Sequence, residues 1–90
     1  MSKARKNKTS NKIRAIALEY DSEEMDAPIV AALGANELAS LILKQAYKSS
    51  VPVVKSDKII KKFNQIEINQ TIPEDLYTEV ANIFVKYSIK

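Results

Sequence analysis

Alternate positions between Arg14 and Tyr20 are apolar, which predicts a strand with one buried face. In an extended chain, neighbouring side chains point to opposite sides of the sheet. One face of this segment holds Ile16, Leu18 and Tyr20, and the other holds Ala15, Ala17 and Glu19. We therefore expect the first face to meet a core of larger side chains than the second.

A second apolar run, residues 29–33, follows Pro28 and ends at Gly34. An acidic turn, residues 21–26, separates the two runs. Because this turn is short, we expect the two strands to pair antiparallel. Gly34 is the only glycine in the chain, which predicts either a positive φ or a close approach of another segment at this position.

Three helical segments are predicted in the second half of the chain. The first begins at the N-cap Asn36 and reaches about Ser50. The second is short, and Ser56 and Asp57 are its caps. The third starts within residues 71–75, where a proline and two acids suit a helix N-terminus. The expected core-facing residues are Leu38, Leu41, Ile42, Gln45 and Ala46 in the first helix, Ile59, Ile60 and Phe63 in the second, and Leu76, Tyr77, Val80, Ala81, Phe84 and Tyr87 in the third. We expect the tyrosines to be core residues with a hydroxyl at the rim.

Residues 51–54 form a short apolar run that predicts a third, buried strand, with Pro52 at its start or on an edge. We expect this strand to be parallel, because the preceding helix is long enough to cross the sheet. The order strand, strand, helix, strand, helix, helix predicts an α/β fold. It is a small sandwich with a short mixed β-sheet flanked by about three helices, and residues 14–90 form its single domain.

The positive charge is concentrated at the N-terminus. Residues 1–14 carry a charge of +6, and the remaining 76 residues hold 8 basic and 11 acidic side chains, which gives −3. We therefore expect residues 1–13 to form a flexible basic tail. Such a tail suits nucleic acid or anionic lipid, and a small nucleic-acid-associated protein is the alternative function. The acidic body of the domain and the absence of aromatic residues among the lysines disfavour nucleic acid.

The composition offers little catalytic chemistry. The chain has no Cys and no His, which removes thiolate ligands and the commonest general base. The acidic turn has no EF-hand spacing, so we expect a solvated loop and no metal site. We also expect no cofactor and no enzymatic activity. No apolar run approaches the roughly 18 residues that span a bilayer.

Five short pieces in order resemble the cytoplasmic switch domain of the FlhB/YscU family of type III export proteins. Residues 14–21 match its strand motif, and residues 51–52 match its Val-Pro. Ala27, Pro28 and Gly34 match its Met-x-Ala-Pro-x-Val-x-Ala-x-Gly motif, and Leu38 and Ala39 match the start of its next helix. Pro73, Leu76 and Tyr77 match its Ile-Pro-x-x-Leu-Tyr motif. The resemblance covers nearly all of residues 14–87.

The family's self-cleavage motif is degenerate in this chain. Family members have Asn-Pro-Thr-His and cleave their backbone after the Asn, whereas this chain has Ser10, Asn11, Lys12 and Ile13. Because the Pro, Thr and His are replaced, we expect no self-cleavage at Asn11; residual cleavage there is a weaker alternative. Asn69 also replaces a usual Gly. The chain resembles the larger post-cleavage fragment, as in stand-alone FlhX-type copies.

The resemblance implies a non-enzymatic accessory component of the flagellar export apparatus, located in the cytoplasm at the inner face of the membrane. Its implied partners are the membrane part of a full-length FlhB-type protein, export substrates and chaperones. Without a neighbouring strand, the strand that contains Ala15, Ile16, Ala17, Leu18, Glu19 and Tyr20 is expected to be an open edge. Such an edge accepts a partner's strand through main-chain pairing.

Overall fold

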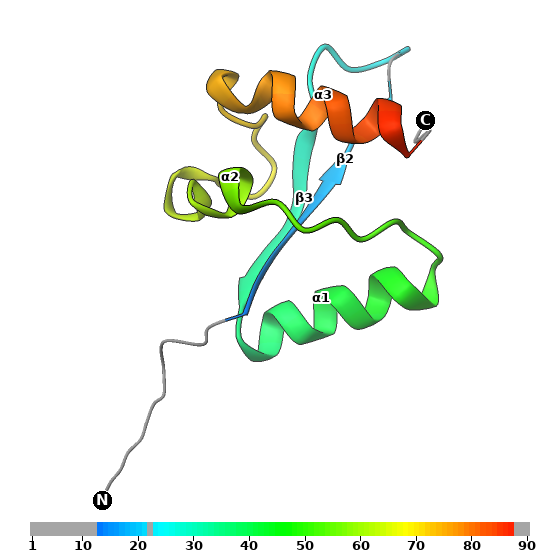
Figure 1. The fold of residues 1–90 in the computed structure, drawn as a ribbon, viewed down its shortest axis with the longest axis vertical. Coiled ribbons are helices and arrows are strands. Elements are labelled where there is room, and N and C mark those ends of the chain that lie inside the picture. The colour runs from blue at the N-terminus through cyan, green and yellow to red at the C-terminus, as the bar shows by residue number, and fades with distance from the viewer. Residues whose placement is uncertain (1–12, 22, 88–90) are drawn as a thin grey trace, which may run out of the picture.

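Two antiparallel strands and three α-helices are present in residues 13–21 and 23–87, the part of the chain that the computed structural model describes (Figure 1). The strands pair side by side, with a bulge between Ala17 and Leu18. This arrangement confirms the α/β class and the antiparallel pairing. The elements are β2 (Arg14–Glu19), β3 (Ile29–Ala35), α1 (Glu37–Lys48), α2 (Asp57–Ile60) and α3 (Tyr77–Lys86), with 3₁₀ turns at Phe63–Gln65 and Glu74–Leu76.

The two faces of the sheet differ in the size of their side chains, as the alternating pattern predicts. Helix α3 lies on one side of the sheet and α1 on the other (Figure 1). On the α3 side, Ile16 and Leu18 pack against the core, and the ring of Tyr20 lies 5.8 Å from that of Phe84. Ala15 alternates with these residues and pairs with Gly34. These small residues let α1 pack closely against the sheet.

The core lies between the sheet, α2 and α3. Its members come from β3, α2, the segment before α3 and α3 itself, so this core depends on packing between segments far apart in the sequence. The fully or nearly fully buried residues of this cluster are Val30, Ile59, Ile66, Ile72, Leu76 and Val80.

Gly34 allows the close approach of α1 to β3, and its φ is not positive. No glycine in the structure has a positive φ. A Cβ atom at Gly34 would lie within 2.9 Å of three side-chain carbons of Leu38, at the start of α1. Real Cβ atoms do not approach that closely, so the missing side chain allows α1 to begin directly against β3.

The N-cap of α1 adopts a strained backbone conformation. Asn36 has φ 57° and ψ −118° and makes no side-chain capping hydrogen bond, so the expected capping role is wrong, although the helix does begin at the next residue. This region of φ/ψ space is open to glycine and costly for other residues. Asn69 also has a positive φ, of 70°, a conformation that glycine adopts without steric cost.

We expect Asn36→Gly to raise the free energy of unfolding by about 1 kcal/mol, because glycine relieves the strain at this position. Asn82→Gly is a matched control. Asn82 is exposed inside α3, where replacing asparagine by glycine costs roughly 0.3 kcal/mol. Urea denaturation followed by circular dichroism should therefore show shifts of opposite sign. A loss of stability in Asn36→Gly would contradict the strain.

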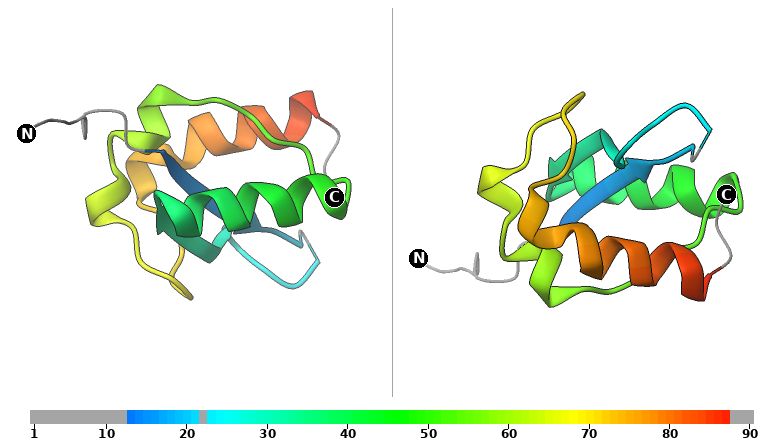
Figure 2. Two further views of the ribbon diagram at one scale, coloured as in Figure 1. Left: turned by 90° about the horizontal axis from the view of Figure 1, so that it is seen from below. Right: turned by 90° about the horizontal axis from the view of Figure 1, so that it is seen from above.

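The predicted third strand is not formed. Residues 51–55, here called the strap, form no regular secondary structure, and Pro52 is exposed. In both views of Figure 2 the strap runs on the β2 side of the sheet, away from β3. In Figure 1 it lies between the levels of α1 and α3. The described sheet therefore has two strands, and the expectation of a mixed sheet with a parallel strand is wrong.

Two helices are rotated from the expected orientation. In α1 the buried residue is Ala39, and Ile42, Leu43 and Ala46 are half-buried, whereas Leu38 and Leu41 are exposed. In α3 Val80 is buried and Ile83 and Phe84 pack against the core, but Tyr77 and Tyr87 are exposed. Gln45 and Ala81 are exposed as well. The core-facing positions predicted for Leu38, Leu41, Gln45, Ala81 and the two tyrosines are therefore wrong.

Candidate functional site

One edge of the sheet is covered and the other is open within the described residues. The outer edge of β3 is bonded to the segment before α3. Asn69 N–H donates to the carbonyl of Val30 over 2.8 Å, and Val30 N–H donates to the carbonyl of Gln70 over 2.9 Å. An isolated bridge joins Ile29 to Thr71. The remaining edge belongs to β2, which is the edge that the sequence marks as a partner-binding candidate.

The hydrogen bonds of β3 fix which residues of β2 face outward. Both backbone groups of Val30 point away from β2, so its partner Leu18 is in a non-hydrogen-bonded pair. Such pairs alternate along an antiparallel ladder. The outward-facing N–H and C=O groups of β2 are therefore those of Arg14, Ile16 and Leu18, while Ala15, Ala17 and Glu19 bond to β3.

The outward backbone groups of Ile16 and Leu18 have no backbone partner among the described residues. Both residues are half-buried, and their side chains pack against the core. A half-buried row of unpaired donors and acceptors favours pairing with another extended chain. The edge is therefore a candidate binding site for a strand.

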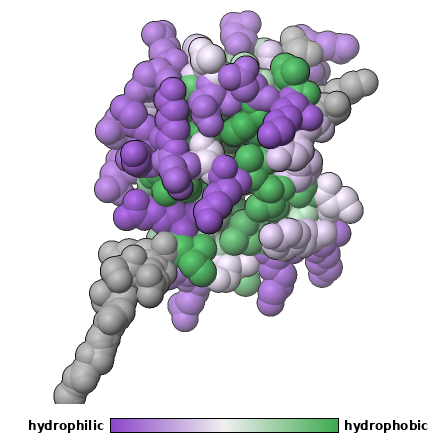
Figure 3. Space-filling view, viewed as in Figure 1, coloured by the Kyte–Doolittle hydropathy of each residue, from purple (hydrophilic) through white to green (hydrophobic). Residues whose placement is uncertain are grey.

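Apolar side chains gather on the same side of the molecule. The space-filling view shows an apolar band on the face seen in Figure 1, between the levels of α1 and α3 (Figure 3). The exposed fractions of nearby large apolar side chains are 51% for Leu38, 60% for Leu41, 53% for Val51 and 40% for Val53. Exposed apolar surface next to an open strand edge is typical of an interaction site.

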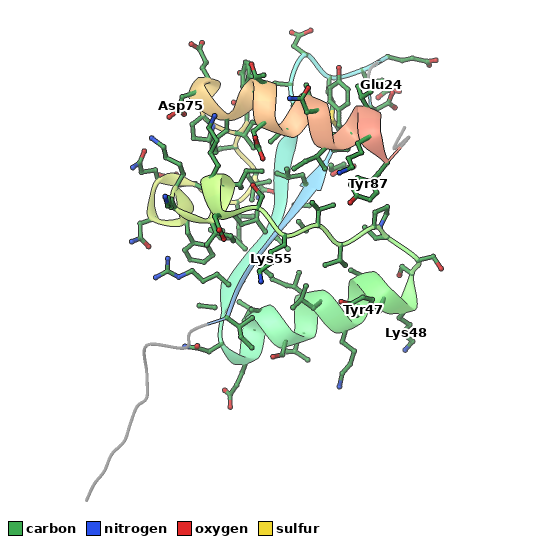
Figure 4. All side chains as sticks on the ribbon, viewed as in Figure 1. Glu24, Tyr47, Lys48, Lys55, Asp75 and Tyr87 are labelled. Carbon is green, nitrogen blue, oxygen red and sulfur yellow. The ribbon has the colours of Figure 1, made fainter. Side chains whose placement is uncertain are left out.

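Opposite charges mark the two ends of β2. Arg14 begins the strand, and its guanidinium lies 5.2 Å from the ring centre of Phe63. Glu19 ends the strand, and Asp21 follows. Asp21 also shapes the acidic turn, because its Oδ1 accepts a 2.9 Å hydrogen bond from Glu23 N–H. In Figure 4, Glu24, in this turn, and Asp75 both lie in the upper part of the molecule, near opposite ends of α3.

An ion pair joins the segment that follows α2 to the 3₁₀ turn that precedes α3. Lys62 Nζ lies 2.7 Å from Asp75 Oδ2. This hydrogen bond from Lys62 holds the pKa of Asp75 below its ordinary value of 3.8, and the positive charges of Lys62 and Lys58 act in the same direction. The stabilisation is present above pH 3.8 and is lost as pH falls through the lowered pKa.

We expect a carboxyl-detected NMR titration to give Asp75 a pKa below 3.8 in the native protein and close to 3.8 in Lys62→Met. Lys58→Met is the control, because Lys58 acts on Asp75 only through its distant charge and should shift the pKa less. An unchanged pKa in Lys62→Met would rule out the ion pair in solution.

The family-motif residues lie at three separate places in the fold. Ile72 N–H donates to the carbonyl of Pro28 over 3.1 Å, which brings the motif with Ala27 beside the motif with Pro73 and Leu76. Ala27 and Leu76 are buried, whereas Tyr77 is 40% exposed. Gly34 lies under α1, and Pro52 lies in the exposed strap. The motifs thus do not converge on a single site.

The degenerate cleavage motif lies mostly outside the described residues. Ser10, Asn11 and Lys12 are not described, and Ile13 is 48% exposed, with its carbonyl accepting a 2.7 Å hydrogen bond from Asn36 N–H. Within the described part of the chain, no group of His, Cys, Asp or Glu is arranged to hold a metal ion. None of the described helices is long and apolar enough to cross a membrane.

Sequence reasoning missed the exposed apolar residues of α1 and of the strap. Leu38 and Leu41 have helical spacing and suggest a core face, and only the burial of Ala39 shows that the helix is turned otherwise. The small side chains on one face of β2 could have predicted this orientation. A helix that packs closely on a sheet face of alanines has small residues at the contact.

Comparison with known proteins finds one family. Residues 12–86 match the family described as "FlhB HrpN YscU SpaS Family". The Bacillus subtilis protein YlqH is 37% identical over 71 residues, which are 79% of this chain and 76% of YlqH. The flagellar biosynthetic protein FlhB of the same organism is 40% identical over 70 residues, 77% of this chain but only 19% of FlhB. The chain thus spans about a fifth of that relative.

Solved structures of the same family share the fold. The C-terminal domain of an EscU H265A mutant has a TM-score of 0.78 and 28% identity, covering 83% of this chain and 92% of that domain. The cytoplasmic domain of FlhB from Shewanella putrefaciens has a TM-score of 0.78 and 27% identity, covering 86% of this chain and 65% of that domain. The fold of this chain is therefore that of the C-terminal cytoplasmic domains of this family.

Proposed function

Because the chain belongs to the FlhB HrpN YscU SpaS family, we propose that it is a non-enzymatic accessory component of the flagellar, type III protein export apparatus. It takes or supports the place of the cleaved cytoplasmic fragment of a full-length switch protein. In that place it helps to set which class of substrates is exported. It works in the cytoplasm, at the inner face of the membrane.

The observation that carries this proposal is the open outer edge of β2 in a domain that otherwise matches its relatives. The match runs over residues 12–86, and the motif residues Ala27, Gly34 and Leu76 occupy positions that the fold requires. The fold matches that of the relatives, and the outer edge of β2 is half-buried and unpaired among the described residues. Together these observations support a role in which a strand of another chain pairs with β2.

The sequence supports a role without catalysis. Self-cleavage in the family uses an Asn-Pro bond, and here Lys12 follows Asn11. The chain also has no His to act as a base. Intact mass spectrometry after prolonged incubation should show a single full-length species, and a fragment that begins at Lys12 would contradict the non-enzymatic role.

The partner that this edge fits best is the membrane part of a full-length FlhB-type protein after that protein has been cleaved. Such a fragment has lost the domain that contained its complementary strand partner. Export substrates and their chaperones are further partners at the assembled apparatus. No direct anchoring in the membrane is needed, since the association runs through the apparatus.

Co-purification tests this proposal. The tagged chain should retain the membrane part of an FlhB-type protein whose own post-cleavage fragment has been deleted, and should retain less of the same protein when that fragment is present to compete. Deletion of the gene for this chain should alter motility in cells that lack the competing fragment. No retention together with unchanged motility would overturn the proposal.

A further inference from the structure

The chain turns directly from β3 into α1 at Asn36 (Figure 1). This residue has φ 57° and ψ −118°, and main-chain hydrogen bonds hold it on both sides. Asn36 N–H donates to the carbonyl of Ile13 over 2.7 Å, and Ser40 N–H donates to the carbonyl of Asn36 over 3.0 Å. The fold therefore maintains a backbone conformation that an unrestrained asparagine seldom adopts.

This value of ψ brings the backbone nitrogen of Glu37 close to the side chain of Asn36. Around the Cα–C bond, Cβ is displaced by about a third of a turn from the residue's own backbone nitrogen. At ψ −118° the nitrogen of Glu37 is therefore almost eclipsed with Cβ of Asn36, whereas in helical and extended residues it lies well away from Cβ. The eclipsed arrangement is that of a five-membered ring, and rotation about Cα–Cβ then brings Cγ of Asn36 to the Glu37 nitrogen.

Both groups that would close this ring are free to react. The N–H of Glu37 is the first of α1, so it has no acceptor within the helix, and it donates to no other described backbone group. The side chain of Asn36 is exposed and makes no capping hydrogen bond. The positive end of the helix also stabilises the negative charge that develops on the Glu37 nitrogen as its proton leaves.

The other three asparagines in the described residues lack this combination. The residue after Asn64 donates its N–H to a main-chain carbonyl over 2.8 Å, and the residue after Asn69 does so over 3.3 Å. Asn82 lies inside α3, where the next N–H is bonded within the helix. A hydrogen-bonded N–H is a poorer nucleophile, so these three sites should react more slowly than Asn36.

We propose that Asn36 is a site of spontaneous succinimide formation. The nitrogen of Glu37 attacks Cγ of Asn36, so an N–Cγ bond forms and the Cγ–Nδ2 bond breaks. The proton of the Glu37 N–H passes through water to the departing Nδ2 group, which leaves as ammonia. The chain keeps its full length, and the reaction needs no cofactor and no partner. It is independent of the proposed function.

Water then opens the imide in one of two ways. Addition at Cγ gives an aspartate, whose negative charge is favourable at the start of α1. Addition at the main-chain carbonyl gives an isoaspartate, in which the main chain passes through Cβ and is one methylene longer. Gly34 and Leu38 pack here without space for a further carbon, so the longer chain should displace the start of α1 from β3.

Peptide mapping by mass spectrometry tests this inference in the full chain. The protein is incubated at mildly alkaline pH, either folded or in guanidinium chloride, and is digested at acidic pH, where imides persist. A peptide with the imide is lighter than its parent by the mass of ammonia. Hydroxylamine cleaves chains at imides, so a treated portion of the folded sample should also give a fragment that begins at Glu37.

Asn36 should form the imide at least about tenfold faster in the folded chain than in guanidinium chloride, because the fold fixes in advance the torsions that an unfolded residue must find. Asn69 is the matched control. It also has a positive φ, of 70°, but the N–H that follows it is bonded, so its rate should not rise on folding. Asn36→Gly should remove the hydroxylamine fragment.

A rate at Asn36 that is equal or lower in the folded chain would overturn the inference, and so would faster imide formation at Asn69 than at Asn36 in the folded chain. A fragment that begins at Glu37 without hydroxylamine would also overturn it, because Nδ2 would then have attacked the main-chain carbonyl instead. None of these results touches the proposed function, which co-purification scores separately.

Discussion

Leu76→Ala is expected to lower the free energy of unfolding by about 3 kcal/mol. Leu76 is fully buried, with a relative exposure of 0%, and it packs among Val30, Ile72 and Val80 in the core. Removing its side-chain carbons leaves a cavity at the point where the segment before α3 meets the sheet. In a domain of this size, such a loss is a large part of the total stability.

Leu41→Ala is the matched control for this measurement. The chemical change is identical, but Leu41 is 60% exposed on α1, so the loss should stay below about 0.5 kcal/mol. Urea denaturation followed by circular dichroism gives both values. Equal losses in the two variants would contradict the orientation of α1 and the position of the core.

Ile16→Pro is expected to weaken binding of the partner by at least about tenfold while the domain stays folded. The N–H of Ile16 faces outward, so proline removes a donor that only the partner uses, and proline is tolerated on strand edges. Because Ile16 also packs against the core, the reference variant is Ile16→Ala, which has the same packing loss but retains the N–H. Binding is measured by co-purification and stability by urea denaturation.

Ala17→Pro should behave in the opposite way. The N–H of Ala17 points toward β3, so proline removes a bond of the ladder itself and leaves a carbonyl of β3 without its donor. This should destabilise the fold by roughly 1–3 kcal/mol. If Ile16→Pro unfolds the domain as Ala17→Pro does, the assignment of inward and outward groups along β2 is wrong. If Ile16→Pro binds as well as Ile16→Ala, the partner does not use this edge.

The sequence predicts those parts of the fold that depend on local pattern. The alternation in residues 14–20 correctly separates the core-facing Ile16 and Leu18 from the alanine face. The predicted cap of α2 is present, because Ser56 Oγ accepts a 3.3 Å hydrogen bond from Ile59 N–H. The sequence correctly singles out Gly34, although it leaves open whether this position needs a positive φ or the close approach of another segment.

The features that the sequence predicts wrongly depend on the presence or absence of neighbours. The apolar run 51–54 has the composition of a buried strand, but a strand needs a partner, and β2 and the strap are not paired in the described structure. Leu38 and Leu41 have the spacing of a core face, but the sheet beneath α1 is lined with alanine and glycine and accepts Ala39 instead. Both errors concern residues on the side of the open edge of β2, where a partner would supply the missing contacts.

Amide hydrogen exchange of β2 tests the central claim most directly. In the free protein, the amides of Ile16 and Leu18 should exchange much faster than those of Ala15 and Ala17, which bond to β3. When the membrane part of an FlhB-type protein is bound, the amides of Ile16 and Leu18 should become protected to a similar degree. Unchanged exchange at both residues in the complex would show that the partner does not complete the sheet, and would contradict the account.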